Sequence, residues 1–508
     1  MNETKRVIVL GLDGACWDVL DPLIEKGIMP NLKRLKQESS WGDLKSSMPP
    51  TTALAWPCFY TGKNPGKHGL MEFLYTDYDY KNKLSSNKDI KADSLWKMLD
   101  HMGKKCAIIH VPTTYPPESL ENGVIVAGML TPSENSDYTM PKKFKSQLKK
   151  IVPGYRVHSL AYKPGKEEEF VEDLKVVLGH RFALMEYFMK QEQDYDFIMC
   201  VISGTDKIHH AMSKYIDPSH FLYTEEKDRF YKPLFENYFR ELDGWIGKML
   251  ENLKKDDLLF MMSDHGSGKC SGIFGINRWL HENGYLKTKK TPLTLKKTFI
   301  KMGINKENIV KITSKHKLKW AEKIARKVIS PNVIPRAEKI TNENIDFMKT
   351  KAFKGPAGIL FNEKGRFKNG FLSKKDIEKL KKRIKKELKD NINPFTEKKL
   401  KINIFEKEAL YQGPNAERAS DLILNIEDQE IRTFPEKDKI FERISEFGAS
   451  GSHRMNGIFL VKGENIKKNK KISITELTDF VPTYFHVSKI KLPPDMDGEL
   501  IKEVFKGK

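Results

Sequence analysis

One short run near the beginning of the chain shapes the expected architecture: Val7-Ile8-Val9-Leu10-Gly11-Leu12-Asp13-Gly14. The residues before the aspartate are all apolar or glycine, and such a run is too short for an independent helix. It is typical of a parallel strand that helices bury on both faces. Because the carboxyl ends of strands in open α/β sheets face the ligand crevice, we expect Asp13 to lie at a functional site.

Similar apolar runs, rich in β-branched residues, recur along the chain and alternate with amphipathic stretches. They span residues 106–111, 124–127, 197–202, 258–262, 422–425 and 458–461. This alternation is the pattern of strands separated by covering helices. We therefore predict an α/β protein with a doubly wound, mostly parallel sheet.

The composition is that of a globular protein. The chain has 508 residues, of which 39% are hydrophobic and 31% are charged. No run approaches the ~20 apolar residues that span a bilayer, and the first residues pass directly into a strand without room for a signal peptide. We expect a cytoplasmic protein without a transmembrane segment. Its five scattered cysteines form no C-x-x-C pair, which indicates reduced thiols.

Two further predicted strands lead to aspartate–histidine pairs, Asp206 with His210 and Asp264 with His265. Another histidine, His453, precedes the last predicted strand. Converging carboxylates repel one another unless a cation holds them, and mixed carboxylate and imidazole ligands suit zinc or a similar divalent transition metal. A lone strand-end aspartate is more often a helix cap, but the joint pattern predicts a metal site.

A candidate nucleophile lies in the stretch Met48-Pro-Pro-Thr51-Thr52-Ala-Leu-Ala-Trp56. A threonine at the start of a helix has its hydroxyl near backbone N–H groups that attract phosphate. A neighbouring metal ion could also lower the pKa of that hydroxyl. The simpler alternative is that Thr51 or Thr52 only caps the helix.

In their order along the chain, these motifs resemble those of the type I phosphodiesterase/nucleotide pyrophosphatase family of the alkaline-phosphatase superfamily. The matching stretches are Leu10-Gly-Leu-Asp13-Gly14, Thr52 to Thr61-Gly62, Asn64-Pro-Gly-Lys-His68-Gly69, Thr205-Asp206-x-x-x-His210, Ser263-Asp264-His265-Gly266 and Gly451-Ser-His453. The resemblance extends from residue 7 to about residue 498 and is weak across a Lys-rich segment. It implies a sheet of the alkaline-phosphatase-like type.

The resemblance also implies roles for particular residues. The distance along the chain to Thr61-Gly62 places the nucleophile on Thr52 rather than on Thr51. The family usually carries two zinc ions. Two divalent cations are therefore the expected cofactors, and zinc is the expected metal. The implied ligands are Asp206, His210 and His453 for one ion, and Asp13, Asp264, His265 and Thr52 for the other.

The function implied in this way is hydrolysis of phosphodiester or nucleotide pyrophosphate bonds in a small anionic substrate, through a phosphothreonine on Thr52. Two departures bear on the substrate. Ala53-Leu54 replaces the family's Phe-Pro, and Glu72-Phe73 lies where an asparagine is typical. A phosphomonoesterase or phosphoryl-transfer enzyme on the same metal site is therefore the alternative. A sulfatase is disfavoured because its nucleophile motif is missing.

A Lys-rich segment, residues 287–404, interrupts the α/β alternation. We interpret it as a helical inserted cap or subdomain between two parts of a catalytic core, residues 1–286 and 405–508. The formal net charge of +21 would attract anions, and nucleic acid or a membrane surface is a possible partner. A basic polyanion-binding protein with a relict site is thus the alternative from another class, although lysines on solvated helix faces explain the charge more simply.

Overall fold

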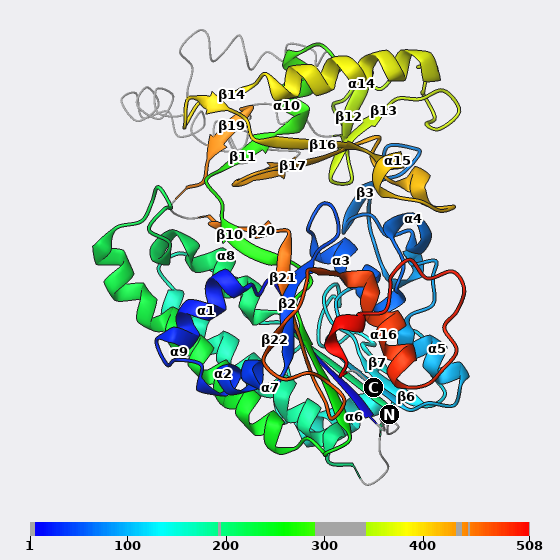
Figure 1. The fold of residues 1–508 in the computed structure, drawn as a ribbon. Coiled ribbons are helices and arrows are strands. Elements are labelled where there is room, and N and C mark those ends of the chain that lie inside the picture. Colours follow the sequence, from blue (N-terminus) through cyan, green and yellow to red (C-terminus); the bar gives the residue numbers. More distant parts are fainter. Residues whose placement is uncertain (1–5, 192–194, 290–341, 433–438, 446–447, 507–508) are drawn as a thin grey trace, which may run out of the picture.

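The computed structural model describes residues 6–191, 195–289, 342–432, 439–445 and 448–506. A ten-stranded sheet crosses the larger part of the molecule, in the order β22-β2-β21-β9-β1-β8-β5-β6-β7, with β23 beside β2 (Figure 1). Its strands are β1 (Arg6–Leu12), β2 (Ser40–Lys45), β5 (Cys106–Ile109), β6 (Gly123–Val126), β7 (Thr139–Met140), β8 (Phe197–Ile202), β9 (Asp257–Met262), β21 (Asn456–Lys462), β22 (Lys470–Lys471) and β23 (Thr475–Glu476).

The five central strands, β9-β1-β8-β5-β6, are parallel, which confirms the predicted fold class. Two apolar runs differ from the expectation of parallel strands. The run at 458–461 is β21, which is antiparallel to β9, and the run at 422–425 is β17 (Leu422–Ile426), which belongs to a separate sheet. Burial makes a strand apolar whatever its direction or partners, so apolarity alone could not distinguish these cases.

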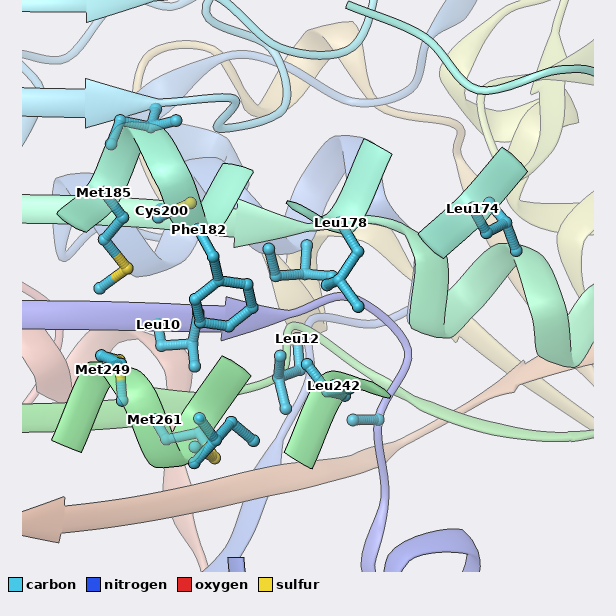
Figure 2. Packing of buried hydrophobic residues seen from close by; sticks show 14 of the residues in the cluster. Leu10, Leu12, Leu174, Leu178, Phe182, Met185, Cys200, Leu242, Met249 and Met261 are labelled. Carbon is cyan, nitrogen blue, oxygen red and sulfur yellow. The ribbon is translucent and has the colours of Figure 1, made fainter. Parts of the chain in front are cut away.

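Helices cover both faces of the sheet, and β1 contributes to both cores. Ile8, Leu10 and Leu12 point into one core, whereas Val7 and Val9 point into the other. Figure 2 shows Leu10 and Leu12 between the two long helices of the first core. That face is covered by α1 (Trp17–Glu25), α2 (Pro30–Gln37), α6 (Phe144–Ile151), α7 (Glu167–Met189), α8 (Gly204–Ile216) and α9 (Glu225–Glu251), and the other by α3 (Thr52–Thr61), α5 (Leu95–His101) and α16 (Phe480–Val487).

A smaller lobe lies beyond one end of the sheet, at the top of Figure 1. Its four-stranded antiparallel sheet has the order β12-β13-β17-β16. We define this lobe as α10 (Ile276–Glu282), β12 (Ala352–Gly355), β13 (Gly358–Phe361), α14 (Lys374–Lys389), β16 (Ile402–Glu406) and β17. The two lobes are joined through β11 (Gly272–Gly275), β18 (Gln429–Arg432) and β19 (Phe441–Arg443), and through β10 (Gly266–Lys269) paired with β20 (Gly451–Arg454).

The helix expected within the Lys-rich segment is α14, and a capping box of Ser373 and Asp376 begins it. Its apolar side, with Ile384 and Leu388, is buried in the smaller lobe. Because α10 precedes residue 287 and β17 follows residue 404, this lobe combines the Lys-rich segment with residues on both sides of it. The domain boundaries at 286 and 404 stay a prediction. Residues 290–341 of the segment lie outside the described residues. In the part that is described, no helix is long and apolar enough to cross a membrane.

Candidate metal centre

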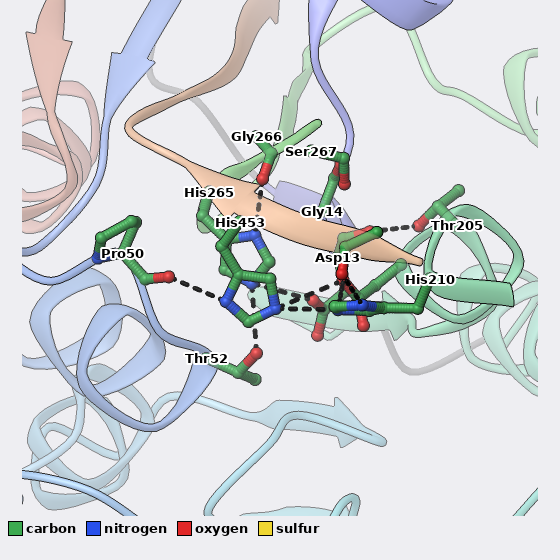
Figure 3. Close-up of polar contacts among 12 residues, drawn as sticks. Asp13, Gly14, Pro50, Thr52, Thr205, His210, His265, Gly266, Ser267 and His453 are labelled. Atoms are coloured by element: carbon green, nitrogen blue, oxygen red, sulfur yellow. Dashed lines mark hydrogen bonds and ion pairs between the residues drawn. The ribbon is translucent and has the colours of Figure 1, made fainter. Parts of the chain in front are cut away.

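Seven predicted site residues meet at the carboxyl ends of β1, β8 and β9 (Figure 3). Each residue lies on a strand or helix or directly follows one. Asp13 follows β1, Asp206 and His210 lie one turn apart on α8, which follows β8, and Asp264 and His265 follow β9. The remaining two come from elsewhere in the chain, His453 from β20 and Thr52 from the first residue of α3.

One cluster consists of Asp206, His210 and His453. The Nε2 atoms of His210 and His453 lie 3.2 and 3.7 Å from Oδ1 of Asp206. The same two Nε2 atoms are 3.0 Å apart. The ligand atoms of these residues therefore converge within 4.8 Å of one another.

The second cluster consists of Asp13, Asp264 and His265, again with ligand atoms within 4.8 Å. Nε2 of His265 lies 3.6 Å from Oδ1 of Asp13 and 3.3 Å from Oδ2 of Asp264. The hydroxyl of Thr52 contacts the same Nε2 atom at 3.2 Å. The clusters adjoin, because the rings of His265 and His453 stack with their centroids 3.8 Å apart.

All three histidines present Nε2 to the centre because Nδ1 is engaged elsewhere. Each Nδ1–H donates to a backbone carbonyl at 2.8–3.0 Å, an arrangement typical of metal-binding histidines. Nε2 of His210 and Nε2 of His453 therefore point into the same space, where both could bind one cation. The acceptors are the carbonyls of Gly451 for His210, Gly266 for His265 and Pro50 for His453.

The carboxylates carry a second sign of a cation. Oδ1 of Asp13, Oδ1 of Asp206 and Oδ2 of Asp264 are buried without a hydrogen-bond partner among the described residues. These are the same oxygens that face the histidines. Buried polar atoms are rarely left without partners, so the donor set fits divalent cations with mixed oxygen and nitrogen ligands.

Without a cation, burial and the neighbouring charges shift the pKa values of the site residues. Burial, together with repulsion from Asp206, raises the pKa of Asp264 to about 8. Burial and the charges of Asp264 and Asp206 raise the pKa of Asp13 well above its usual range. Burial opposes a charge on His210, but the neighbouring Asp206 carboxylate outweighs it and raises the pKa of His210 to about 9.

These shifts predict how the metal-free protein responds to pH. Between about pH 6.5 and 8, the folded state holds protons on Asp264 that the unfolded state, with a pKa near 3.9, has already lost. Raising the pH in this window therefore lowers the free energy of unfolding, by about 1 kcal/mol per pH unit for each such proton. Denaturant unfolding in the presence of a chelator measures this slope. Asp264→Asn should reduce the slope, and an equal or steeper slope in that variant would contradict the assignment.

Thr52 is placed by the start of α3. Thr51 occupies the N-cap position, but its side chain makes no cap hydrogen bond, so the capping alternative fails for Thr51. The first N–H groups of a helix have no partner within the helix and form a natural anion site. Thr52 thus has its hydroxyl at the cluster of Asp13, Asp264 and His265 and its backbone at a site suited to an anion.

Sequence reasoning missed two residues that support Asp13. Nε1 of Trp56, one turn after Thr52, donates to Oδ2 of Asp13 at 3.4 Å, and the hydroxyl of Thr205 donates to the Asp13 carbonyl at 2.5 Å. Gly11 leaves room for the same tryptophan, since a Cβ there would lie 2.4 Å from its ring. The four-residue spacing between Thr52 and Trp56 is the signal that could have revealed the tryptophan.

The fold is of the alkaline-phosphatase-like type. Three solved structures share the fold. Murine ectonucleotide pyrophosphatase/phosphodiesterase 5 is 14% identical over 99% of this chain and 100% of its own, with a TM-score of 0.52. Phosphonoacetate hydrolase from Sinorhizobium meliloti is 13% identical over 96% of both chains, with a TM-score of 0.52. The alkaline phosphatase PafA is 14% identical over the whole of both chains, with a TM-score of 0.55.

The family follows from the sequence itself. The profile of the type I phosphodiesterase/nucleotide pyrophosphatase family matches residues 7–451, and the chain belongs to this family. No curated protein sequence gives a significant match. The resemblance stated from the motifs is therefore confirmed, and the chain belongs to a family of phosphoester hydrolases.

The two departures from the family pattern have structural counterparts. Ala53 and Leu54 are buried in a cluster with Tyr411 and Ile423, so the first turn of α3 packs against the smaller lobe and its neighbouring loop. Glu72, in the stretch where the family's asparagine is missing, accepts a hydrogen bond from the N–H of Phe73 at 2.8 Å. Burial raises the pKa of Glu72, and the nearby charge of Lys354 on β12 opposes that effect.

Proposed function

We propose that this protein hydrolyses phosphodiester or nucleotide pyrophosphate bonds through a phosphothreonine on Thr52. The reaction would use two divalent cations, for which zinc is the expected metal. One observation carries the proposal: the Thr52 hydroxyl lies 3.2 Å from His265 Nε2. His265 belongs to the cluster that also contains the carboxylates of Asp13 and Asp264. A hydroxyl held there can be both activated and directed at a bound phosphoryl group.

Each part of the site has a task in this reaction. Asp13, Asp264 and His265 would hold one cation, and Asp206, His210 and His453 the other. When bound, the cations would neutralise the phosphoryl oxygens and lower the pKa of the attacking hydroxyl. The N–H groups at the start of α3 would orient the phosphoryl group. Thr52 Oγ1 then attacks phosphorus, the alcohol or nucleotide leaves, and water hydrolyses the phosphothreonine.

A structural neighbour supports the choice of threonine and of a nucleotide-type substrate. Murine ectonucleotide pyrophosphatase/phosphodiesterase 5 has been solved as an inactive threonine-to-alanine variant in complex with AMP. Nucleotide esters are therefore the first substrates to test. The stretch after His68-Gly69 lacks the asparagine typical of the family, however, and this departure keeps a phosphomonoesterase or phosphoryl-transfer enzyme as the second candidate.

The smaller lobe is proposed to influence substrate choice. Its neighbouring loop is tied to the segment before Thr52, because the hydroxyl of Tyr411 donates to the carbonyl of Met48. Arg418 likewise donates to the carbonyl of Gly69 at 3.0 Å. Through these contacts the smaller lobe can restrict which ester groups approach Thr52 without taking part in the chemistry.

The test is a substrate panel on protein loaded with Zn²⁺. We expect kcat/KM for a phosphodiester or a dinucleotide pyrophosphate to exceed that for the matched monoester by at least about tenfold, a difference of ~1.4 kcal/mol in transition-state stabilisation. The reverse preference would select the phosphomonoesterase instead. Full metal content without turnover of any ester would overturn the proposed function.

A further inference from the structure

The strand that carries His453 is joined to α8 at His210 by a compact group of hydrogen bonds. The N–H of Ser450 donates to the His210 carbonyl at 2.7 Å, and the Ser450 hydroxyl donates to the same carbonyl at 3.2 Å. The hydroxyl also accepts from the N–H of Lys214 at 3.0 Å. The carbonyl of Gly451 completes the group by accepting from Nδ1 of His210 at 2.8 Å.

This junction is tightly closed. Ser450 is fully buried, and a Cβ on Gly451 would lie 2.7 Å from Nδ1 of His209 and 2.8 Å from Cα of His210. Backbone therefore contacts backbone. Removal of the Ser450 hydroxyl would leave polar groups of α8 buried with fewer partners.

The junction lies between two members of one cluster. His210 is part of it, and His453 follows Ser450 by three residues on the same chain segment. The Nε2 atoms of the two histidines are 3.0 Å apart, so a small shift of β20 against α8 changes their separation. Partners that orient metal-binding side chains commonly change metal affinity by about 10- to 100-fold when they are mutated.

We propose that Ser450 is a positioning residue, which holds His453 against His210 and thereby sets the affinity of the Asp206, His210 and His453 cluster for its divalent cation. The inference rests on the metal-binding part of the proposed function. The other cluster, which contains Asp13 and Asp264, has no hydrogen bond to Ser450 among the described residues. Loss of the hydroxyl should therefore weaken one of two cation sites.

The experiment is a Zn²⁺ titration of the metal-free full chain against a competing chelator, with Ser450→Ala as the variant. We expect one of two equivalents to bind at least about tenfold more weakly and the other to change by less than about twofold. Ser452→Ala is the matched control, since this serine lies two residues further along β20 and should leave both affinities unchanged. Wild-type affinity for both equivalents in Ser450→Ala, or equal weakening of both, would overturn the proposal.

Further variants separate an effect on this cluster from a general disturbance of the fold. In an Asp206→Asn background, in which the affected cluster has lost its carboxylate, Ser450→Ala should have no further effect on the remaining equivalent. If the alanine variant does not fold, Ser450→Thr and Ser450→Val replace it, because they share a shape and differ in the hydroxyl, and only the valine variant should lose affinity. Zn²⁺ binding is read without substrate, so the result stands whether or not the protein hydrolyses the proposed esters.

Discussion

Thr52→Ala is expected to lower kcat of the Zn²⁺-loaded protein by at least about a thousandfold, because it removes the group that forms the covalent intermediate. Metal content should fall little, since the carboxylates and histidines of both clusters remain in place. Steady-state kinetics and metal analysis on the same preparation measure both quantities. Wild-type kcat in this variant would end the assignment of Thr52 as the nucleophile.

Thr51→Ala is the matched control for that experiment. Thr51 is adjacent in sequence and also lies at the start of α3, but its side chain makes no cap hydrogen bond. Its Oγ1 atom is buried and has no partner among the described residues. We therefore expect kcat within about twofold of the wild type and a smaller loss of stability than the ~1 kcal/mol of a lost cap.

Removal of the metal ions is the second change with a large expected effect. Dialysis against a chelator should lower kcat by at least about a thousandfold, because the developing phosphoryl charge loses its stabilisation. Added Zn²⁺ should restore turnover, whereas Ca²⁺, which prefers shells made only of oxygen, should not. Undiminished activity in protein shown by elemental analysis to contain almost no metal would contradict the two-cation proposal.

The same experiment predicts a gain in stability on metal binding. A ligand that binds only the folded state stabilises it by about 4 kcal/mol at a thousandfold excess over its Kd. The effect should be pronounced here because the carboxylates of Asp13, Asp206 and Asp264 each have a buried oxygen without a partner among the described residues. Thermal unfolding with and without Zn²⁺ measures the shift in Tm, and Asp264→Asn should reduce it.

Much of the fold could be predicted because the evidence for it is local. The parallel core strands β1, β5, β6, β8 and β9 are short apolar runs, and burial on both faces leaves that mark in the sequence. The capping box of Ser373 and Asp376 at the start of α14 is likewise a local signal in the sequence. The antiparallel direction of β21 and the membership of β17 in a second sheet could not be predicted, because both depend on which strands meet in space.

The candidate site divides in the same way. Asp13, Asp206 and Asp264 stand out in the sequence because each follows a recognisable strand, and topology brings the ends of neighbouring parallel strands together. The contact of Thr52 with His265, the support of Asp13 by Trp56 and the junction of Ser450 with His210 each join elements that are far apart in the chain. Residue types and local spacing thus reveal which chemistry is available. The distances and orientations that make it usable arise only when the strands pair and the helices pack, because hydrogen bonds and lone pairs act over a few ångströms in space, whatever the separation along the chain.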